Sequence, residues 1–202
     1  DNTFATALLQ KPLELGATIS LTSTTKYING HSDALGGAIC THDITWNEKM
    51  KFAQKALGLQ PSPFDCWLIT RGIKTLPLRL KKQVDNALQL ANELTKHSCV
   101  QSVRYPFHSD HPQNKLAQKQ MTGGGAIITI NLKATQKQAY SFCKGLKYFT
   151  MAESLGGIES LICHPSTMTH ASVPSHIKQN LGIDDGLVRL SIGCEDFSDL
   201  DR

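Results

Sequence analysis

The stretch from Gly16 to Thr41 reads GATISLTSTTKYINGHSDALGGAICT. Its first part, Gly16–Ser23, alternates in polarity and is rich in β-branched residues, which predicts a strand. The polar segment TTKYINGHSD follows and is typical of a turn. The segment Leu35–Thr41 then predicts a second strand, in spite of the glycines that it contains. Lys26 is therefore expected where a strand ends and a polar loop begins, a place from which its side chain can project into a cleft.

The rest of the chain mixes helices and strands. Trp46–Leu57 has helical spacing, and Leu59–Phe64 interrupts it with two prolines. The longest predicted helix is Thr75–His97, with an apolar stripe formed by Leu76, Leu80, Val84, Leu88 and Leu94. Further predicted elements are strands at Val100–Tyr105, Ala126–Leu132 and Leu187–Ile192 and helices at Asn114–Gln120 and Thr135–Gly145. This mixture predicts an α/β or α+β layer structure.

Composition excludes several classes of protein. The 202 residues suffice for one large domain or two smaller ones, and 40% hydrophobic with 19% charged residues is an ordinary globular balance. The net charge of +4 is spread along the chain and gives little support to nucleic-acid binding. No apolar run is long enough to span a bilayer, and the start lacks the pattern of a signal peptide. We expect a soluble, cytoplasmic protein that binds neither nucleic acid nor membrane.

Cysteines and histidines give no metal signature. The six cysteines are widely spaced without a CxxC pair, so reduced thiols are favoured over a disulfide framework. The histidines at 31, 164 and 170 also lack ligand spacing, and no metal is expected. Both ends look cut: Asp1 leads straight into a structured-looking segment, and the final EDFSDLDR reads like a helix whose apolar face is incomplete. We therefore expect a portion of a longer polypeptide.

Lys26 is the most informative residue for chemistry. A free lysine has a pKa of about 10.4 and is a poor nucleophile at neutral pH. A cofactor aldehyde removes that obstacle by binding the amine as a Schiff base. The hydroxyls of Ser23 and Thr25 flank Lys26 and are suitable donors to a phosphate. By itself this pattern also fits a Ser/Thr-rich turn with a solvated lysine.

Several motifs in order resemble one enzyme family. The segment TSTTKYINGHSDALGGAI (22–39) is similar to the cofactor-lysine segment of the Cys/Met metabolism family of pyridoxal-phosphate enzymes. That family includes cystathionine γ-lyase, γ-synthase and β-lyase and methionine γ-lyase. The likeness extends over essentially the whole chain, through DNTF (1–4), PSPFDCWLITRGIKTL (61–76), AESLGGIESLICHPSTMTHASVP (152–174), SHIKQNLGI (175–183) and GLVRLSIGCED (186–196).

The resemblance implies roles for residues around the cofactor, pyridoxal 5'-phosphate. Lys26 would carry the aldehyde, and Ser23 and Thr25 would bind the phosphate. Asp1 matches the aspartate that pairs with the pyridine nitrogen, where a carboxylate keeps the nitrogen protonated so that the ring accepts electrons. A frayed terminal acid is the alternative for Asp1.

The resemblance also implies a substrate end. Arg189, in an otherwise apolar strand, would bind the α-carboxylate of an amino acid through its planar fork, although an edge arginine reaching solvent is the alternative. Ser154 would assist at the same carboxylate, or else cap a helix or turn. Glu153, otherwise a surface acid, resembles the acid of the γ-lyase and γ-synthase branches. It could hold the distal ammonium of cystathionine.

The implied fold is the type I pyridoxal-phosphate transferase fold, which resembles that of aspartate aminotransferase. Residues 1–72 would form the closing part of the large cofactor domain and residues 73–202 the small C-terminal α+β domain. The resemblance also implies a homotetramer, arranged as a dimer of dimers. The implied activity is that of a cystathionine γ-lyase, with γ-synthase as the alternative. A non-catalytic unit that serves only folding or oligomerisation also remains open.

Overall fold

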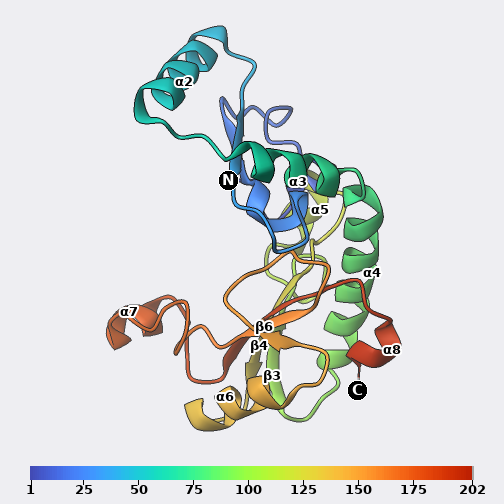
Figure 1. The fold of residues 1–202 in the computed structure, drawn as a ribbon. Coiled ribbons are helices and arrows are strands. Elements are labelled where there is room, and N and C mark those ends of the chain that lie inside the picture. Colours follow the sequence, from blue (N-terminus) through green and yellow to red (C-terminus); the bar gives the residue numbers. More distant parts are fainter. Residues whose placement is uncertain (202) are drawn as a thin grey trace.

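The computed structural model describes residues 1–201, in which helices pack around a mixed sheet (Figure 1). In chain order the elements are α1 (Thr6–Leu9), β1 (Ser20–Ser23), the π-helical turn η1 (Thr24–Ile28), β2 (Gly37–Cys40), α2 (Ile44–Leu57), α3 (Pro63–Ile73), α4 (Leu76–Leu94), β3 (Val100–Arg104), α5 (Asn114–Gln120), β4 (Ile127–Leu132), α6 (Gln136–Gly145), β5 (Thr150–Met151), β6 (Leu161–Cys163), α7 (Ser175–Asn180), β7 (Leu187–Ser191) and α8 (Phe197–Leu200). The mixed α/β class predicted from the sequence is confirmed.

The central sheet has the strand order β3-β4-β7-β6-β5 and is antiparallel except where β5 pairs with β6. Leu190 of β7 lines a cavity together with Leu90 of α4 and Phe142 of α6, so these helices cover one face. Because successive strand side chains alternate between faces, the neighbouring Arg189 projects from the other face. There it lies in register with Thr129 of β4 and Cys163 of β6.

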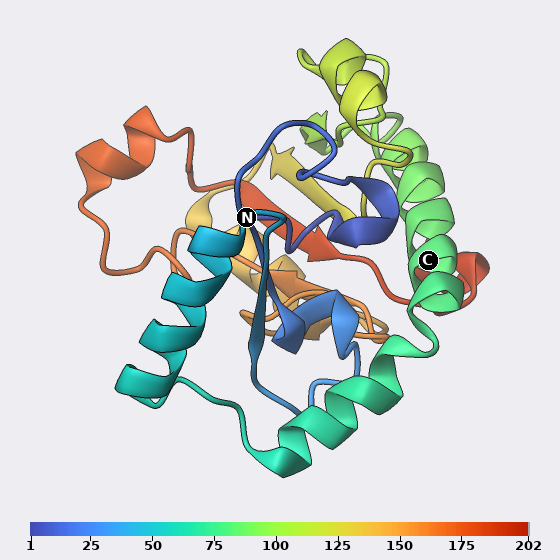
Figure 2. The same cartoon turned by 90° about the horizontal axis from the view of Figure 1, so that it is seen from above.

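The long helix α4 has a more polar buried face than its sequence predicts. Leu76 and Leu80 are buried as expected, but Leu88 is 38% exposed, so the predicted stripe is wrong there. Gln83 and Asn86 are fully buried. Their amide nitrogens donate to backbone carbonyls of the segments that pack against the helix, Gln83 to Gly157 O at 2.6 Å, whereas their amide oxygens have no partner within residues 1–201. Figure 2 shows α3 leading into α4 along one flank of the structure.

The prolines after α2 begin a helix that the sequence analysis missed. Gly58 ends α2 with a φ of 67°, which agrees with the predicted interruption. Pro63 then occupies the first turn of α3, where its missing N–H costs nothing, and the Ser62 hydroxyl caps the Asp65 N–H. The segment between two helices is therefore shorter than Leu59–Phe64.

The remaining differences concern short elements. The first predicted strand is confirmed only over Ser20–Ser23, which pairs with β2. The strands β5 and β6 and the helix α7 were not predicted, because two to six residues are too few to show a period. The predicted bounds of α5 are confirmed at both ends, and those of β3, β4, α6 and β7 within one residue at each end.

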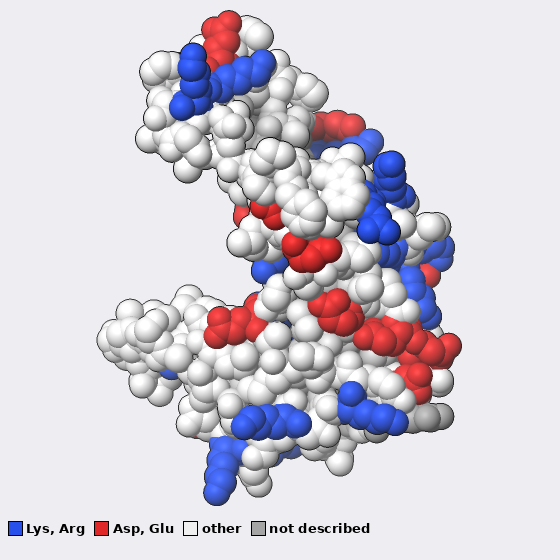
Figure 3. Space-filling view, viewed as in Figure 1, with Lys and Arg blue, Asp and Glu red and all other residues white. Residues whose placement is uncertain are grey.

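Two helices stand away from the sheet. Figures 1 and 3 show α2 and α7 projecting on either side of a hollow. No residue of α2 is buried, and Ile44, Phe52 and Leu57 are exposed. Basic and acidic side chains are interspersed on the face shown in Figure 3, without a continuous basic surface. Within residues 1–201, no helix is both long and apolar enough to cross a membrane.

Candidate active site around Lys26

Lys26 lies in the π-helical turn η1, directly after β1. Its φ of −90° and ψ of −127° break the helical geometry inside the turn. Two backbone hydrogen bonds close the turn around it, from Asn29 N to Thr24 O at 3.0 Å and from Gly30 N to Lys26 O at 2.8 Å. The lysine is therefore held on a tight, irregular turn rather than on the open polar loop that the sequence suggests.

The Lys26 amine contacts one of the three residues predicted to bind substrate and is close enough to a second to feel its charge. Its Nζ donates to the Ser154 Oγ at 3.2 Å, across 128 positions of sequence. Partial burial lowers the pKa of Lys26 below that of an ordinary lysine, and the positive charge of Arg189 lowers it further. Both effects favour the free amine, which is the form that reacts with an aldehyde or accepts a proton.

Arg189 holds the loop that presents Ser154. Its Nη2 donates to the carbonyls of Glu153 at 2.7 Å and Ser154 at 3.0 Å. Its Nη1 and Nε form no hydrogen bond within residues 1–201, so donors on either side of Nη2 remain for an anion. The loop also packs closely on η1, because a Cβ at Gly156, whose φ is +78°, would lie 2.8 Å from the Tyr27 nitrogen.

The residues predicted to bind the cofactor lie on segments next to Lys26. The Ser23 hydroxyl forms no hydrogen bond within the described residues, whereas the Thr25 hydroxyl accepts from Gly36 N at 3.0 Å and donates to Gly36 O at 3.3 Å. Asp1 precedes a segment bonded alongside β1, where the Ser23 N–H donates to the Thr3 hydroxyl at 2.9 Å. In residues 1–201, Asp1 makes no hydrogen bond to Lys26.

Asp1 and Glu153 are both exposed acids. Asp1 lines a cavity of about 370 Å³ together with Arg104 and His111, while its Oδ1 accepts from the Thr3 N–H. Glu153 contacts Arg189 through its backbone carbonyl, and no ion pair joins their side chains within residues 1–201.

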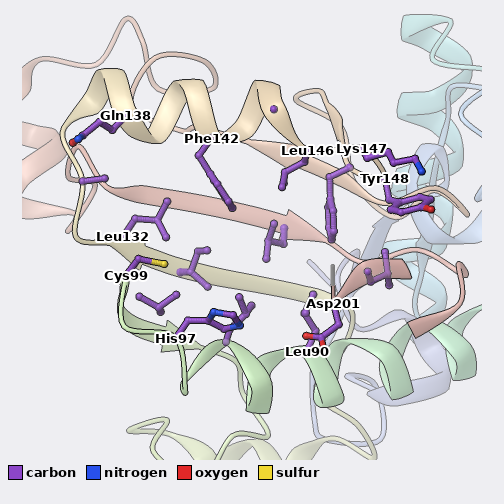
Figure 4. Close-up of a pocket in the computed structure, with 18 of the residues that line it drawn as sticks. Leu90, His97, Cys99, Leu132, Gln138, Phe142, Leu146, Lys147, Tyr148 and Asp201 are labelled. Carbon is purple, nitrogen blue, oxygen red and sulfur yellow. The ribbon is translucent and has the colours of Figure 1, made fainter. Parts of the chain in front are cut away.

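A cavity of about 610 Å³ lies away from these residues. It opens between α4, α6 and the sheet and is mostly apolar, with Leu90, Leu132 and Phe142 among its walls (Figure 4). None of the predicted site residues lines it. No group of three or more His, Cys, Asp or Glu side chains in the described chain could hold a metal ion. His164 is buried and bonded to Thr167 and to the Asp185 carbonyl, as expected of a structural histidine.

One residue beside the site escaped the sequence analysis. Arg79 of α4 is 7% exposed, and its guanidinium donates to the Tyr27 carbonyl at 2.9 Å, one residue after Lys26. A signal was present, since Arg79 lies three positions after Leu76 and next to Leu80 on the predicted buried face. A charged residue in such a place needs a polar partner.

Known proteins match this chain over its whole length. The family described as Cys/Met metabolism PLP-dependent enzyme matches residues 1–202. The chain is 48% identical to a cystathionine gamma-lyase of Dictyostelium discoideum over 99% of its own length and 52% of that protein. It is also 48% identical to a cystathionine beta-lyase of Coxiella burnetii, again over 99% of this chain and 52% of the relative.

A solved structure is similar throughout. The cystathionine gamma synthase of Xanthomonas oryzae pv. oryzae, in complex with aminoacrylate and cysteine, matches with a TM-score of 0.96 and 47% identity over 100% of this chain and 52% of that one. The chain thus spans about half the length of the relatives it matches. Match over its full length, together with the same fold, shows that the chain belongs to the Cys/Met metabolism family of pyridoxal-phosphate-dependent enzymes.

Proposed function

We propose that the chain carries the reaction centre of a cystathionine γ-lyase, which cleaves cystathionine and water into cysteine, 2-oxobutyrate and ammonia. The observation that supports this most is the convergence of the Lys26 amine, the Ser154 hydroxyl and the Arg189 guanidinium, contributed by segments far apart in sequence. An amine of lowered pKa beside a cation that can receive a carboxylate suits chemistry on an amino acid.

The residues present fit pyridoxal phosphate. Lys26 would hold its aldehyde, and the free hydroxyl of Ser23 would donate to its phosphate. Thr25 could join after giving up its long bond to the Gly36 carbonyl. Asp1 would pair with the ring nitrogen; the cavity that it lines includes none of the other predicted site residues. When bound, the cofactor supplies an aldehyde for amines and a ring that withdraws electrons from the substrate's Cα.

The protein's own groups would bind the substrate and move its protons. Arg189 would receive the α-carboxylate on its free Nη1 or Nε while its Nη2 keeps Ser154 in place. The Lys26 amine would take the proton from Cα, because its lowered pKa increases the fraction present as free base at neutral pH. Its tether keeps it within reach of Cβ and Cγ, so one amine can serve successive proton transfers.

Glu153 would select the substrate. Its exposed carboxylate could lie at the mouth of the site and bind the distal ammonium of cystathionine by charge-assisted hydrogen bonds, which a simple thioether cannot offer. Replacing Glu153 by glutamine should then raise KM for cystathionine more than it lowers kcat. An unchanged KM would remove Glu153 from this role.

The competing activity is that of a cystathionine γ-synthase, which joins cysteine to an activated homoserine. Its support is the similarity to the Xanthomonas enzyme, with a TM-score of 0.96. The protein with added pyridoxal phosphate should be given cystathionine alone. Cysteine and 2-oxobutyrate would support the γ-lyase, whereas homocysteine and pyruvate would indicate cleavage at Cβ. No cleavage, with turnover of activated homoserine plus cysteine, would favour the synthase.

We also propose a cytoplasmic homotetramer, a dimer of dimers, with the chain divided into parts at residues 1–72 and 73–202. The exposed apolar side chains of α2, including Phe52 at 74%, support a contact with further protein. Sedimentation equilibrium should give a tetramer mass. A chain that assembles but binds no cofactor and turns over no substrate would instead be a folding or oligomerisation unit.

A further inference from the structure

Arg79 places a charged group against the backbone of the lysine turn. Its Nη1 donates to Tyr27 O at 2.9 Å, and its Nη2 reaches Ile28 O at 3.3 Å and Asn29 O at 3.5 Å. The same Nη2 donates to Gly72 O at 2.9 Å. One side chain of α4 therefore contacts three successive carbonyls that follow Lys26, together with the end of α3.

The surroundings hold this guanidinium in one orientation. Its Nε donates to the Thr75 hydroxyl at 2.9 Å. A Cβ at Gly30, whose φ is +73°, would lie 2.1 Å from Nη1, so that glycine admits the fork where another residue would exclude it. A Cβ at Gly72 would similarly lie 2.3 Å from Asn29 O. The turn and the two helices thus meet in a contact with no spare room.

In the described part of the chain, the two terminal nitrogens of the Arg79 guanidinium donate to carbonyl groups alone. Within residues 1–201, no carboxylate forms an ion pair with Arg79. The carbonyls at the end of a helical turn carry partial negative charge, and a cation there is favourable. Burial lowers the pKa of Arg79, but an arginine remains charged in proteins. The fork therefore acts as a charged cap on the turn that carries Lys26.

We propose that Arg79 is a positioning residue for Lys26: by binding the carbonyls after it, Arg79 fixes the broken turn in which the Lys26 amine reaches Ser154. This rests on the proposed function of Lys26 as the cofactor lysine. Arg79 touches no reacting atom, and its effect passes through the backbone. Without the fork, the three carbonyls lose their charged donor and the turn is free to relax away from the −90°, −127° geometry of Lys26.

The test compares Arg79→Met with Arg79→Lys and with Arg71→Met, a matched change on an exposed α3 residue. Hydrogen exchange of the Asn29 and Gly30 amides is measured in the protein without cofactor. The amides donate across the turn, so Arg79→Met should speed their exchange at least about tenfold, the loss of one charged hydrogen bond. Arg79→Lys, which keeps the charge without the fork, should lie between. Arg71→Met should match the wild type.

A second readout follows the amine itself. Lys26 is acetylated with a limiting amount of reagent at a series of pH values, and the extent is quantified by peptide mass spectrometry. The pH dependence of this acetylation should change in Arg79→Met and should not change in Arg71→Met. If Arg79→Met does not fold, Thr75→Val serves instead. It removes the acceptor of Nε, together with the bond of the same hydroxyl to Gly72 O at 3.1 Å, and should show the same changes at smaller size. Unchanged exchange and unchanged acetylation in a folded variant would overturn the proposal.

These outcomes are distinguishable from those that test the proposed function. Exchange and acetylation need neither cofactor nor substrate, so they stand even if the wild type cleaves no cystathionine. Where the wild type does turn over, Arg79→Met should lower kcat with little change in KM, since the carboxylate site at Arg189 is left intact. A rise in KM alone would contradict a positioning role.

Discussion

Replacing Arg189 by methionine should strongly weaken the use of cystathionine. The guanidinium keeps Nη1 and Nε free, and because these donors lie on different edges, a carboxylate can take one of them in a charge-assisted hydrogen bond, which contributes about 1.5–3 kcal/mol. Arg189 is partly exposed, so solvent screening favours the lower end, about 1.5 to 2 kcal/mol. At about 1.36 kcal/mol per tenfold, kcat/KM should fall about 10- to 30-fold.

Steady-state kinetics would separate this effect from general damage. The loss should fall mainly on KM, because the carboxylate is bound in both ground and transition states. Arg189→Lys keeps the charge but loses the planar fork and should lose less, about threefold. Arg71→Met is the control and should behave as the wild type. A fall in kcat/KM of less than about threefold in Arg189→Met would refute the assigned role, because it corresponds to less than half the free energy of a tenfold change.

The pH profile provides an independent check on the same variant. Arg189 lowers the pKa of Lys26, second to desolvation, so its removal should raise that pKa. The rising limb of kcat against pH should therefore move to higher pH in Arg189→Met. It should move less in Arg189→Lys, which retains the positive charge. A limb that stays in place in both variants would show that the two groups do not interact.

Three further changes have defined outcomes. Ser154→Ala removes the acceptor of the Lys26 Nζ and should lower kcat about tenfold, the worth of one such hydrogen bond; turnover at saturating cystathionine measures it. Gly156→Ala should reduce the free energy of unfolding in urea by about 1–3 kcal/mol, because the new Cβ would clash with the Tyr27 nitrogen and the residue has a positive φ. Gly145 has open space around it, so Gly145→Ala should not reduce the free energy of unfolding. Lys26→Met should stabilise the fold at neutral pH, because the lowered pKa of Lys26 in the folded protein means that the protonated amine disfavours folding. The urea midpoints of the variant and the wild type should converge as the pH rises towards the ordinary lysine pKa. A gap that stays constant with pH would contradict this.

The sequence predicts elements best where their period is long enough to read. Asn114–Gln120 has both ends right, because its neighbours on either side are turn-forming. The helix Pro63–Ile73 was missed since its prolines were interpreted as breakers, although Pro63 stands at the one place where a helix accepts proline. Strands of two or three residues are too short to show an alternating sequence pattern. The two-residue strand β5, for example, forms because it pairs with β6.

The candidate site, too, was predicted in part and missed in part. Lys26, Ser154 and Arg189 were predicted from motifs in a shared order, and the structure brings them together. The irregular turn around Lys26 could not be predicted, because it depends on contacts with Gly156 and Arg79 that lie far along the chain. Local sequence favours an open polar loop there, and tertiary packing overrides it.

Identifying the lysine that carries the cofactor tests the central claim most directly. The protein should be mixed with pyridoxal phosphate, reduced with borohydride to make the attachment permanent, digested, and mapped by mass spectrometry. The mass of one reduced cofactor on the peptide that contains Lys26, and its disappearance in Lys26→Ala, is the expected result. Attachment spread over surface lysines, or unchanged labelling in Lys26→Ala, would contradict the account.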